Sequence, residues 1–106
     1  MAKVSWTIKA DCLFDKYVFN AFLEYGQKTS KKWMQERIVF ADRVAKQPES
    51  YMLEPLLADR KRKYRSCQIM GRFKIVYFYA KSSEVVHVVD IWDSKANPKA
   101  LIRRIK

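Results

Sequence analysis

The chain opens on an alternation of apolar and polar residues that is typical of a half-buried β-strand. From Val4 to Lys9 the sequence reads Val-Ser-Trp-Thr-Ile-Lys, with an apolar side chain at every second position. Successive side chains of a strand point to opposite faces of a sheet, so this spacing places Val4, Trp6 and Ile8 on one side. We therefore expect a strand at residues 4–9 with these three side chains against the core.

A helical period replaces the alternation from Ala10 onward. Apolar residues recur three and four positions apart as far as Tyr25, and Gly26 then supplies a stop. Thr29 and Ser30 are suitable N-caps for a second amphipathic helix, which runs to about Lys46 before Pro48. The apolar stripes of both helices predict core packing rather than cofactor binding.

The second half of the chain is rich in β-branched and aromatic residues. A loop at 48–59, interrupted by Pro55, is expected to tuck the leucines of its 53–57 stretch against the core. Strands are predicted at 64–69, 73–80 and 85–92, and a short basic helix at 99–106. This order predicts one α+β domain over residues 1–106: an N-terminal strand, a helical hairpin, an antiparallel three-strand meander with both helices on one face, and a C-terminal helix.

The turns at Met70-Gly71 and Ser82-Ser83 define an expected strand register. The predicted pairs are Cys67 with Lys74, Arg65 with Val76, Lys74 with Ile91, Val76 with Val89, and Phe78 with His87. This register puts Arg65, Cys67, Lys74 and His87 on one face, and Phe73, Ile75, Tyr77 and Tyr79 on the other. Arg65 and Lys74 become diagonal neighbours about 7–8 Å apart at Cβ, where two cations favour an anion between them. The alternatives are that both point to solvent at a frayed edge, or that the register slips by one residue and the pairing is lost. For His87, a hydrogen-bonded core histidine is favoured over a catalytic one.

The charge balance indicates a polyanionic partner. The 106 residues include 22 Lys and Arg against 11 Asp and Glu, for a formal net charge of +11. The segment from Glu54 onward carries 13 of these basic residues and five of the acidic ones. Basic residues gathered on a strand-rich half favour nucleic acid over a membrane surface, and the alternative is a set of cations that serve solubility alone.

Several classes of chemistry have no signature in the sequence. A Gly-rich phosphate loop, a Cys/His cluster with metal spacing and a nucleophile elbow are all missing, so we expect neither a cofactor nor a metal. Catalysis would then depend on Arg and Lys, with Tyr as a further candidate. Such a set suits phosphodiester transfer in RNA, where the 2′-OH is a built-in nucleophile. Cys12 and Cys67 lie far apart in the sequence, and no signal peptide is recognised. We therefore expect both as reduced thiols of a cytoplasmic protein.

Several segments of the second half match a known pattern. They are Tyr64-Arg65-Ser66, Gly71-Arg72-Phe73-Lys74-Ile75-Val76-Tyr77, the strand at 85–91, and the loop Asp93-Ser94-Lys95-Ala96-Asn97-Pro98. Together they resemble the C-terminal sheet of RelE/ParE superfamily toxins, and the helical hairpin and the Glu54-Pro55-Leu56 loop are similar as well. The resemblance implies a RelE/ParE-like fold and a toxin of a type II toxin–antitoxin (plasmid stabilisation) system, held inactive by a cognate acidic antitoxin.

The resemblance also implies residue roles. In the RelE branch the toxin enters the ribosomal A site and cleaves mRNA through the 2′-OH, and basic residues of the sheet carry the reaction. By position, Arg65 would hold the scissile phosphate, while Lys74 and Lys95 would stabilise the developing charge. Lys74 stands where the family usually has Arg, and the C-terminal tyrosine of the RelE type has no counterpart, since Leu101 falls nearby. These departures leave open the ParE branch, whose members poison DNA gyrase and cleave nothing.

The first hypothesis from the sequence is therefore a metal-independent, ribosome-dependent mRNA endonuclease, with the ribosome and mRNA as partners and no membrane contact. The alternative is a non-enzymatic inhibitor of DNA gyrase, and a degraded toxin or a plain nucleic-acid-binding domain remain after both. The residues expected to contact nucleic acid are Lys61, Arg62, Lys63, Arg72, Arg103 and Arg104.

Overall fold

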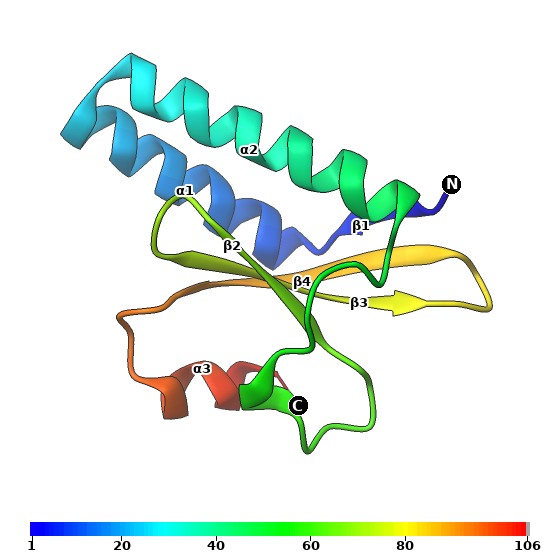
Figure 1. Ribbon diagram of the computed structural model, residues 1–106. Helices are drawn as coiled ribbons and strands as arrows, with labels where there is room; N and C mark the ends of the chain where they lie inside the picture. The colour runs from blue at the N-terminus through cyan, green and yellow to red at the C-terminus, as the bar shows by residue number, and fades with distance from the viewer. Residues whose placement is uncertain (106) are drawn as a thin grey trace.

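A four-stranded sheet forms the middle layer of the computed structural model, which describes residues 1–105 (Figure 1). Its strands are β1 (Lys3–Trp6), β2 (Arg65–Ile69), β3 (Phe73–Ala80) and β4 (Val85–Asp93), in the spatial order β1-β4-β3-β2. The last three form the antiparallel meander, and β1 lies parallel to β4 at one edge. The predicted α+β class and element order are confirmed.

Two antiparallel helices cover one face of this sheet (Figure 1). Helix α1 (Ile8–Tyr25) begins after Thr7, whose hydroxyl accepts a hydrogen bond from the amide of Ala10 at 3.1 Å. Helix α2 (Gln27–Lys46) follows at once, because Gly26 adopts a φ of 93° that permits an abrupt turn between the helices. Their apolar stripes pack on the sheet and form the larger core cluster with Phe73, Ile75, Tyr77, Val86, Val88 and Ile91.

Shorter elements lie against the opposite face. A 3₁₀ turn, η1 (Pro55–Leu57), and the helix α3 (Pro98–Arg104) pack there beneath β3 and β4 (Figure 1). Their cluster consists of Leu57, Tyr64, Val76, Trp92, Leu101 and Ile105. The expectation that leucines of the 53–57 stretch reach the core holds for Leu57, but Leu53 is 50% exposed. The predicted end of the last helix at residue 106 lies outside the described residues.

The N-terminal boundaries differ from those expected. The first strand ends at Trp6, because Thr7 caps the helix and residues 8 and 9 belong to its first turn. Ile8 is therefore 85% exposed, and its predicted place in the core is wrong. The second helix begins at Gln27 rather than after Thr29, since Gly26 acts as both the end of one helix and the cap of the next.

The predicted register of the first hairpin is wrong by one residue. Met70, Gly71 and Arg72 form a three-residue loop with positive φ at the first two positions, so that Ile69 pairs with Phe73 and Arg65 with Tyr77. The second hairpin has the expected pair Phe78–His87, but a bulge at Val76/Tyr77 then shifts the partner of Lys74 to Trp92. As a result Arg65 and Cys67 share the helix-covered face with Tyr77 and Ile75, while Lys74 lies on the α3 side.

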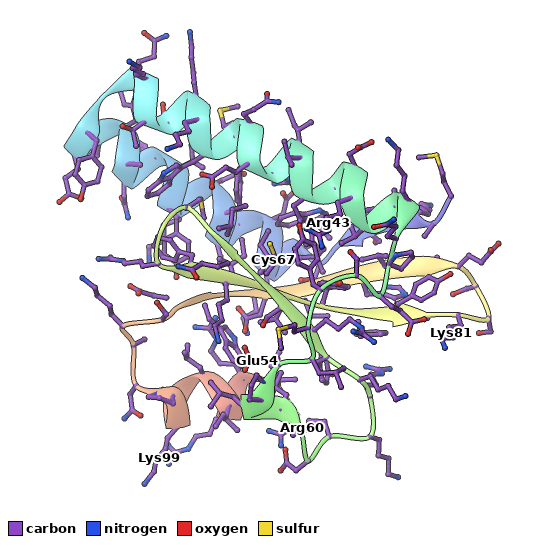
Figure 2. All side chains as sticks on the ribbon, in the orientation of Figure 1. Arg43, Glu54, Arg60, Cys67, Lys81 and Lys99 are labelled. Carbon is purple, nitrogen blue, oxygen red and sulfur yellow. The ribbon has the colours of Figure 1, made fainter. Side chains whose placement is uncertain are left out.

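The side chains follow this division. Cys67 lies on the helix side of the sheet, and Glu54 on the side of η1 and α3 (Figure 2). Both cysteines are free thiols. Within residues 1–105, none of the helices combines the length and the apolar character needed to cross a membrane.

Candidate functional site

Lys74, one of the three predicted catalytic residues, is engaged by a buried carboxylate. Its ammonium group lies 2.9 Å from Oε1 of Glu54, a residue only 1% exposed. The same oxygen accepts a hydrogen bond from the Ser66 hydroxyl, and Oε2 accepts one from the Leu56 amide, each at 2.9 Å. Burial alone would raise the pKa of the Glu54 carboxyl, but these three donors stabilise its charge and hold the pKa below its usual value. The charge of Lys74 is therefore already neutralised.

Arg65 is also engaged, on the other face of the sheet. Its guanidinium donates to the carbonyl of Tyr51 at 2.7 Å and to the carboxylate of Glu49 at 3.3 Å. The side chain is only 16% exposed. Arg65 thus holds the segment after α2 against the edge strand β2. These two contacts occupy guanidinium N–H groups that a bound phosphate would need.

Lys95 lies apart from both. It is exposed in the loop between β4 and α3, where its backbone amide donates to Asp93 at 3.0 Å. Its side chain borders a hollow of about 260 Å³ at the far end of the helical hairpin, beside Tyr17, Tyr25 and Arg72. The structure therefore does not bring together the three residues as expected, since Arg65 and Lys74 occupy opposite faces. Their catalytic roles stay a prediction.

The buried tyrosines are poor candidates for proton transfer. Burial raises the pKa of Tyr51 to about 12, and likewise that of Tyr77 to about 12. The Tyr77 hydroxyl donates to the Pro48 carbonyl at 2.9 Å, so it holds the chain rather than facing solvent. Within residues 1–105, a group of three or more His, Cys, Asp or Glu side chains able to hold a metal is absent.

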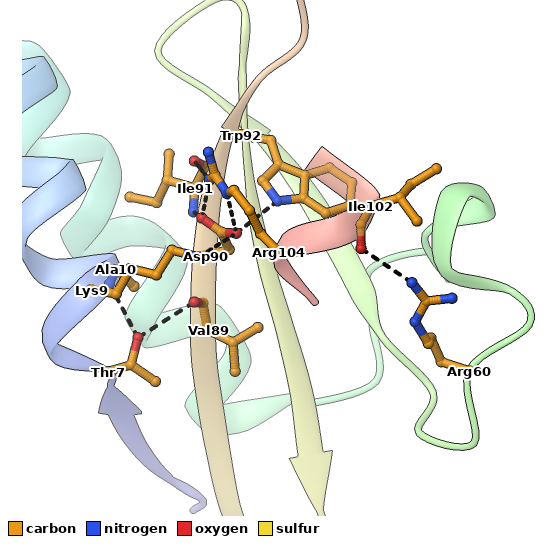
Figure 3. Close-up of polar contacts among 10 residues, drawn as sticks. All are labelled: Thr7, Lys9, Ala10, Arg60, Val89, Asp90, Ile91, Trp92, Ile102 and Arg104. Atoms are coloured by element: carbon orange, nitrogen blue, oxygen red, sulfur yellow. Dashed lines mark hydrogen bonds and ion pairs between the residues drawn. The ribbon is translucent and has the colours of Figure 1, made fainter. Parts of the chain in front are cut away.

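A buried aspartate in β4 was missed by the sequence reasoning. Asp90 is fully buried, and its carboxylate accepts hydrogen bonds from the Trp92 indole at 3.0 Å and the Ile91 amide at 2.8 Å (Figure 3). Arg104 of α3 donates to both of its oxygens, and Lys9 of α1 approaches to 3.4 Å. An acidic residue inside the most apolar run of the sequence was the signal for such a site.

The residues predicted to contact nucleic acid fall into two groups. Arg104 is held by Asp90, and Arg72 lies 3.3 Å from the carboxylate of Asp93. In contrast Lys61, Arg62 and Lys63 are exposed in the loop before β2 and form no ion pair within the described part of the chain, and Arg103 is exposed on α3. The second group offers charge that is not neutralised by a carboxylate of the described residues.

An apolar surface covers the outer side of the helical hairpin. The exposed large side chains there are Phe19, Phe22, Leu23, Met34 and Ile38, each between 49% and 69% exposed. Between the helices, Phe19, Phe22, Met34 and Ile38 border a groove of about 520 Å³, here called the hairpin groove, which Phe14 and Val18 also line. Exposed apolar surface of this extent on one side of a small domain is typical of a binding site.

The fold is similar to that of a solved toxin–antitoxin protein. A chain from a structure described as "Chromosomal ParDE TA system from P. aeruginosa" superposes with a TM-score of 0.70, over 90% of this chain and 98% of that one, at 14% sequence identity. No protein-family model matches the chain, and no curated protein does. The likeness shows the fold and, at this identity, the fold alone.

Proposed function

We propose that this chain is the toxin of a type II toxin–antitoxin system and that it acts by binding its target, with DNA gyrase as the candidate, rather than by cutting RNA. The observation that carries the proposal is the fold, which a chain of a ParDE system shares over nearly its whole length. The resemblance of the sequence to RelE/ParE toxins points in the same direction. Fold and function are separable, so the contacts of the site residues must decide the mechanism.

Those contacts favour binding over cleavage. A metal-independent ribonuclease needs several cations around one phosphate, because they stabilise the charge that develops in the transition state. Lys74 and Arg65 lie on opposite faces, and each already contacts a carboxylate. Lys95 is exposed at a third place. The arrangement offers no common position for a scissile phosphate among these three residues.

The hairpin groove supports the antitoxin part of the proposal. A chain with a formal net charge of +11 and an uncovered apolar groove suits a partner segment that is both acidic and amphipathic. Arg37 at the rim of the groove contacts the carboxylate of Asp11 at 2.7 Å and lies over the ring of Trp6. An antitoxin helix in this groove would cover the apolar side chains and lower the net charge of the complex.

The mRNA endonuclease is the second candidate. The cations at Lys61, Arg62 and Lys63 favour it, because none of them is in an ion pair within residues 1–105 that a phosphate backbone would have to break. Under this reading the reacting groups would still have to be found outside the cluster of Arg65, Lys74 and Lys95.

Induction of the chain alone in a bacterial host tests the proposal. Growth should stop, and supercoiling of a reporter plasmid should be lost before the rate of amino-acid incorporation falls, because the target is gyrase. A small acidic partner expressed with it should restore growth. The control is the same transcript with an early stop codon. Normal growth at strong expression would contradict the toxin assignment, whereas mRNA cleavage on purified ribosomes with unaffected gyrase would favour the second candidate.

A further inference from the structure

We propose that the part of the α3-side sheet face that α3 leaves open binds single-stranded nucleic acid, with bases stacking on Phe78 and His87 and phosphates at Lys61, Arg62 and Lys63. The inference is independent of whether the chain inhibits gyrase. It rests on two features that meet at one place, an aromatic stack on the sheet and a cationic hollow beside it.

The aromatic stack consists of Phe78 and His87, which are direct cross-strand partners on β3 and β4. Their ring centroids are 4.9 Å apart with an interplanar angle of 25°, so the two rings are nearly parallel. Both side chains are half-buried, and Tyr64 supports Phe78 edge-on at 5.7 Å. Because the two rings stack on each other, an unpaired base can stack only on an outer face of the pair, that of His87 or that of Phe78.

The guanidinium of Arg62 packs over the ring of Phe78. Its guanidinium carbon is 4.4 Å from the centroid of the Phe78 ring. Arg62 is an exposed residue of the loop before β2. A planar, delocalised cation over a ring occupies the position that a base plane would take. Because the described residues provide no carboxylate partner for Arg62, the side chain is able to move from the ring to a phosphate when a base arrives.

The cationic hollow adjoins the stack. It has a volume of about 360 Å³ and is lined by Asp59, Arg60, Lys61, Arg62 and Tyr64. Arg60 is engaged, because it donates to Asp59 and to the carbonyls of Ile102 and Ile105 at the end of α3. Lys61 and Arg62 are left to contact a ligand. Arg62 and Tyr64 belong to the hollow and also touch Phe78, so a phosphate in the hollow and a base on the ring are within reach of one nucleotide.

The surface formed by the cationic hollow and the aromatic stack continues across the sheet to β1. Ser5 pairs with His87 and Lys3 with Val85, and both lie on this face because Val4 and Trp6 point to the helices. Lys3 is exposed and has no ion-pair partner within residues 1–105. Cations therefore flank the aromatic stack on both sides, as a strand running across the sheet would require. A duplex would not use the rings, because its bases are stacked on one another, and an acidic protein segment would have no need of them.

Binding of short fluorescent oligothymidylate and oligouridylate to the full chain, measured by anisotropy, tests the inference. An abasic oligonucleotide with the same number of phosphates separates stacking from charge. His87→Ala should weaken binding of the base-bearing strands about tenfold and leave the abasic strand unaffected, whereas His87→Phe, which keeps a ring, should restore binding. Replacing Lys61, Arg62 and Lys63 by Ala should weaken all strands and reduce the salt slope of binding by about two.

A matched control removes three cations elsewhere. Lys28, Lys31 and Lys32 are exposed on α2, so their triple Ala variant carries the same net charge as the loop variant and should keep both the stack-dependent difference and the salt slope. Equal affinity for abasic and base-bearing strands, or equal losses in the two triple variants, would overturn the inference. So would polyglutamate of matched charge that binds as tightly and is weakened as much by His87→Ala. Growth arrest without any oligonucleotide binding would contradict this inference and leave the toxin proposal intact. Oligonucleotide binding without growth arrest would contradict only the toxin proposal.

Discussion

The two faces of the sheet are stabilised in different ways. The centre of the helix-covered face is apolar, with Ile75, Val88 and Ile91 fully buried and aromatic rings such as Phe40 and Tyr77 in edge contact, while Arg65 bonds Glu49 at its β2 edge. The α3 face has a smaller apolar cluster and two almost fully buried carboxylates, those of Glu54 and Asp90. One face depends on apolar volume removed from water, and the other on a few charged contacts that hold distant segments to the strands.

This difference bears on function, because both proposed surfaces are placed by these faces. Asp90 ties α3 and the start of α1 to β4, and Glu54 ties η1 to β2 and β3. Arg60, two residues before Arg62, in turn bonds the last carbonyls of α3. The position of the basic loop beside Phe78 thus depends on the carboxylates, whereas the hairpin groove depends on the packing of α1 against α2 and on the ion pair between Arg37 and Asp11.

The largest effect is expected from Asp90→Ala. The substitution leaves the Trp92 indole and the Ile91 amide without an acceptor and frees Arg104 and Lys9 from their partner. Breaking a buried charged network from one side should lower the free energy of unfolding by about 4 kcal/mol. Urea denaturation followed by tryptophan fluorescence measures the loss.

Asp42→Ala is the matched control, since it removes a carboxylate from an exposed ion pair with Lys46. Such pairs contribute about 0–1 kcal/mol, so the two aspartates should differ severalfold. Similar losses for both variants would mean that the contacts of Asp90 add little beyond those of a surface pair.

Glu54→Gln should have an intermediate effect that depends on pH. The amide cannot neutralise Lys74 and replaces one acceptor oxygen by a donor, at a cost of about 2 kcal/mol near neutral pH. Because the pKa of native Glu54 lies below its unfolded value of about 4.5, the carboxylate stabilises the fold above that pH, and the contribution is lost as the pH falls through the native pKa. The gap between wild type and variant, measured by urea denaturation at a series of pH values, should therefore close in acid.

The exposed Glu84 of the β3–β4 turn offers the control for this titration. Glu84→Gln should change the free energy of unfolding by less than about 0.5 kcal/mol at neutral pH. A constant gap between Glu54→Gln and wild type from neutral to acid pH would show that the hydrogen bonds, and not the charge, account for the effect.

The contrast between the faces also explains what could be predicted from the sequence. The helix-covered face follows from periodicity, so α1, α2 and the inward Phe73, Ile75 and Tyr77 were predicted correctly. The α3 face depends on contacts between segments far apart in the chain, and no local pattern indicates that Glu54 meets Lys74 or that Asp90 meets Arg104.

The predicted site failed for a related reason. Its geometry required Arg65 and Lys74 on one face, and that depended on the length of a single loop. Met70 adopts a φ of 55°, a backbone conformation that the sequence does not indicate, since Met rarely adopts it. With Met70 in this conformation, the loop contains three residues and not the two that the sequence suggested. A change of one residue in register moves every side chain of the strand to the other face, so Arg65 turned toward the helices.

The smallest effect is expected on the apolar face itself. Ile75→Val removes one methylene from a fully buried side chain and should lower the free energy of unfolding by about 1 kcal/mol, since the surrounding side chains relax only partly into the space. The substitution changes no titratable group, so the loss in free energy of unfolding should be the same near neutral pH and in acid. In acid, by contrast, the difference between Glu54→Gln and wild type should have disappeared. Urea denaturation of both variants at the two pH values makes the comparison directly. A loss for Ile75→Val that changed with pH as much as the Glu54→Gln loss would show that the two faces are not stabilised independently.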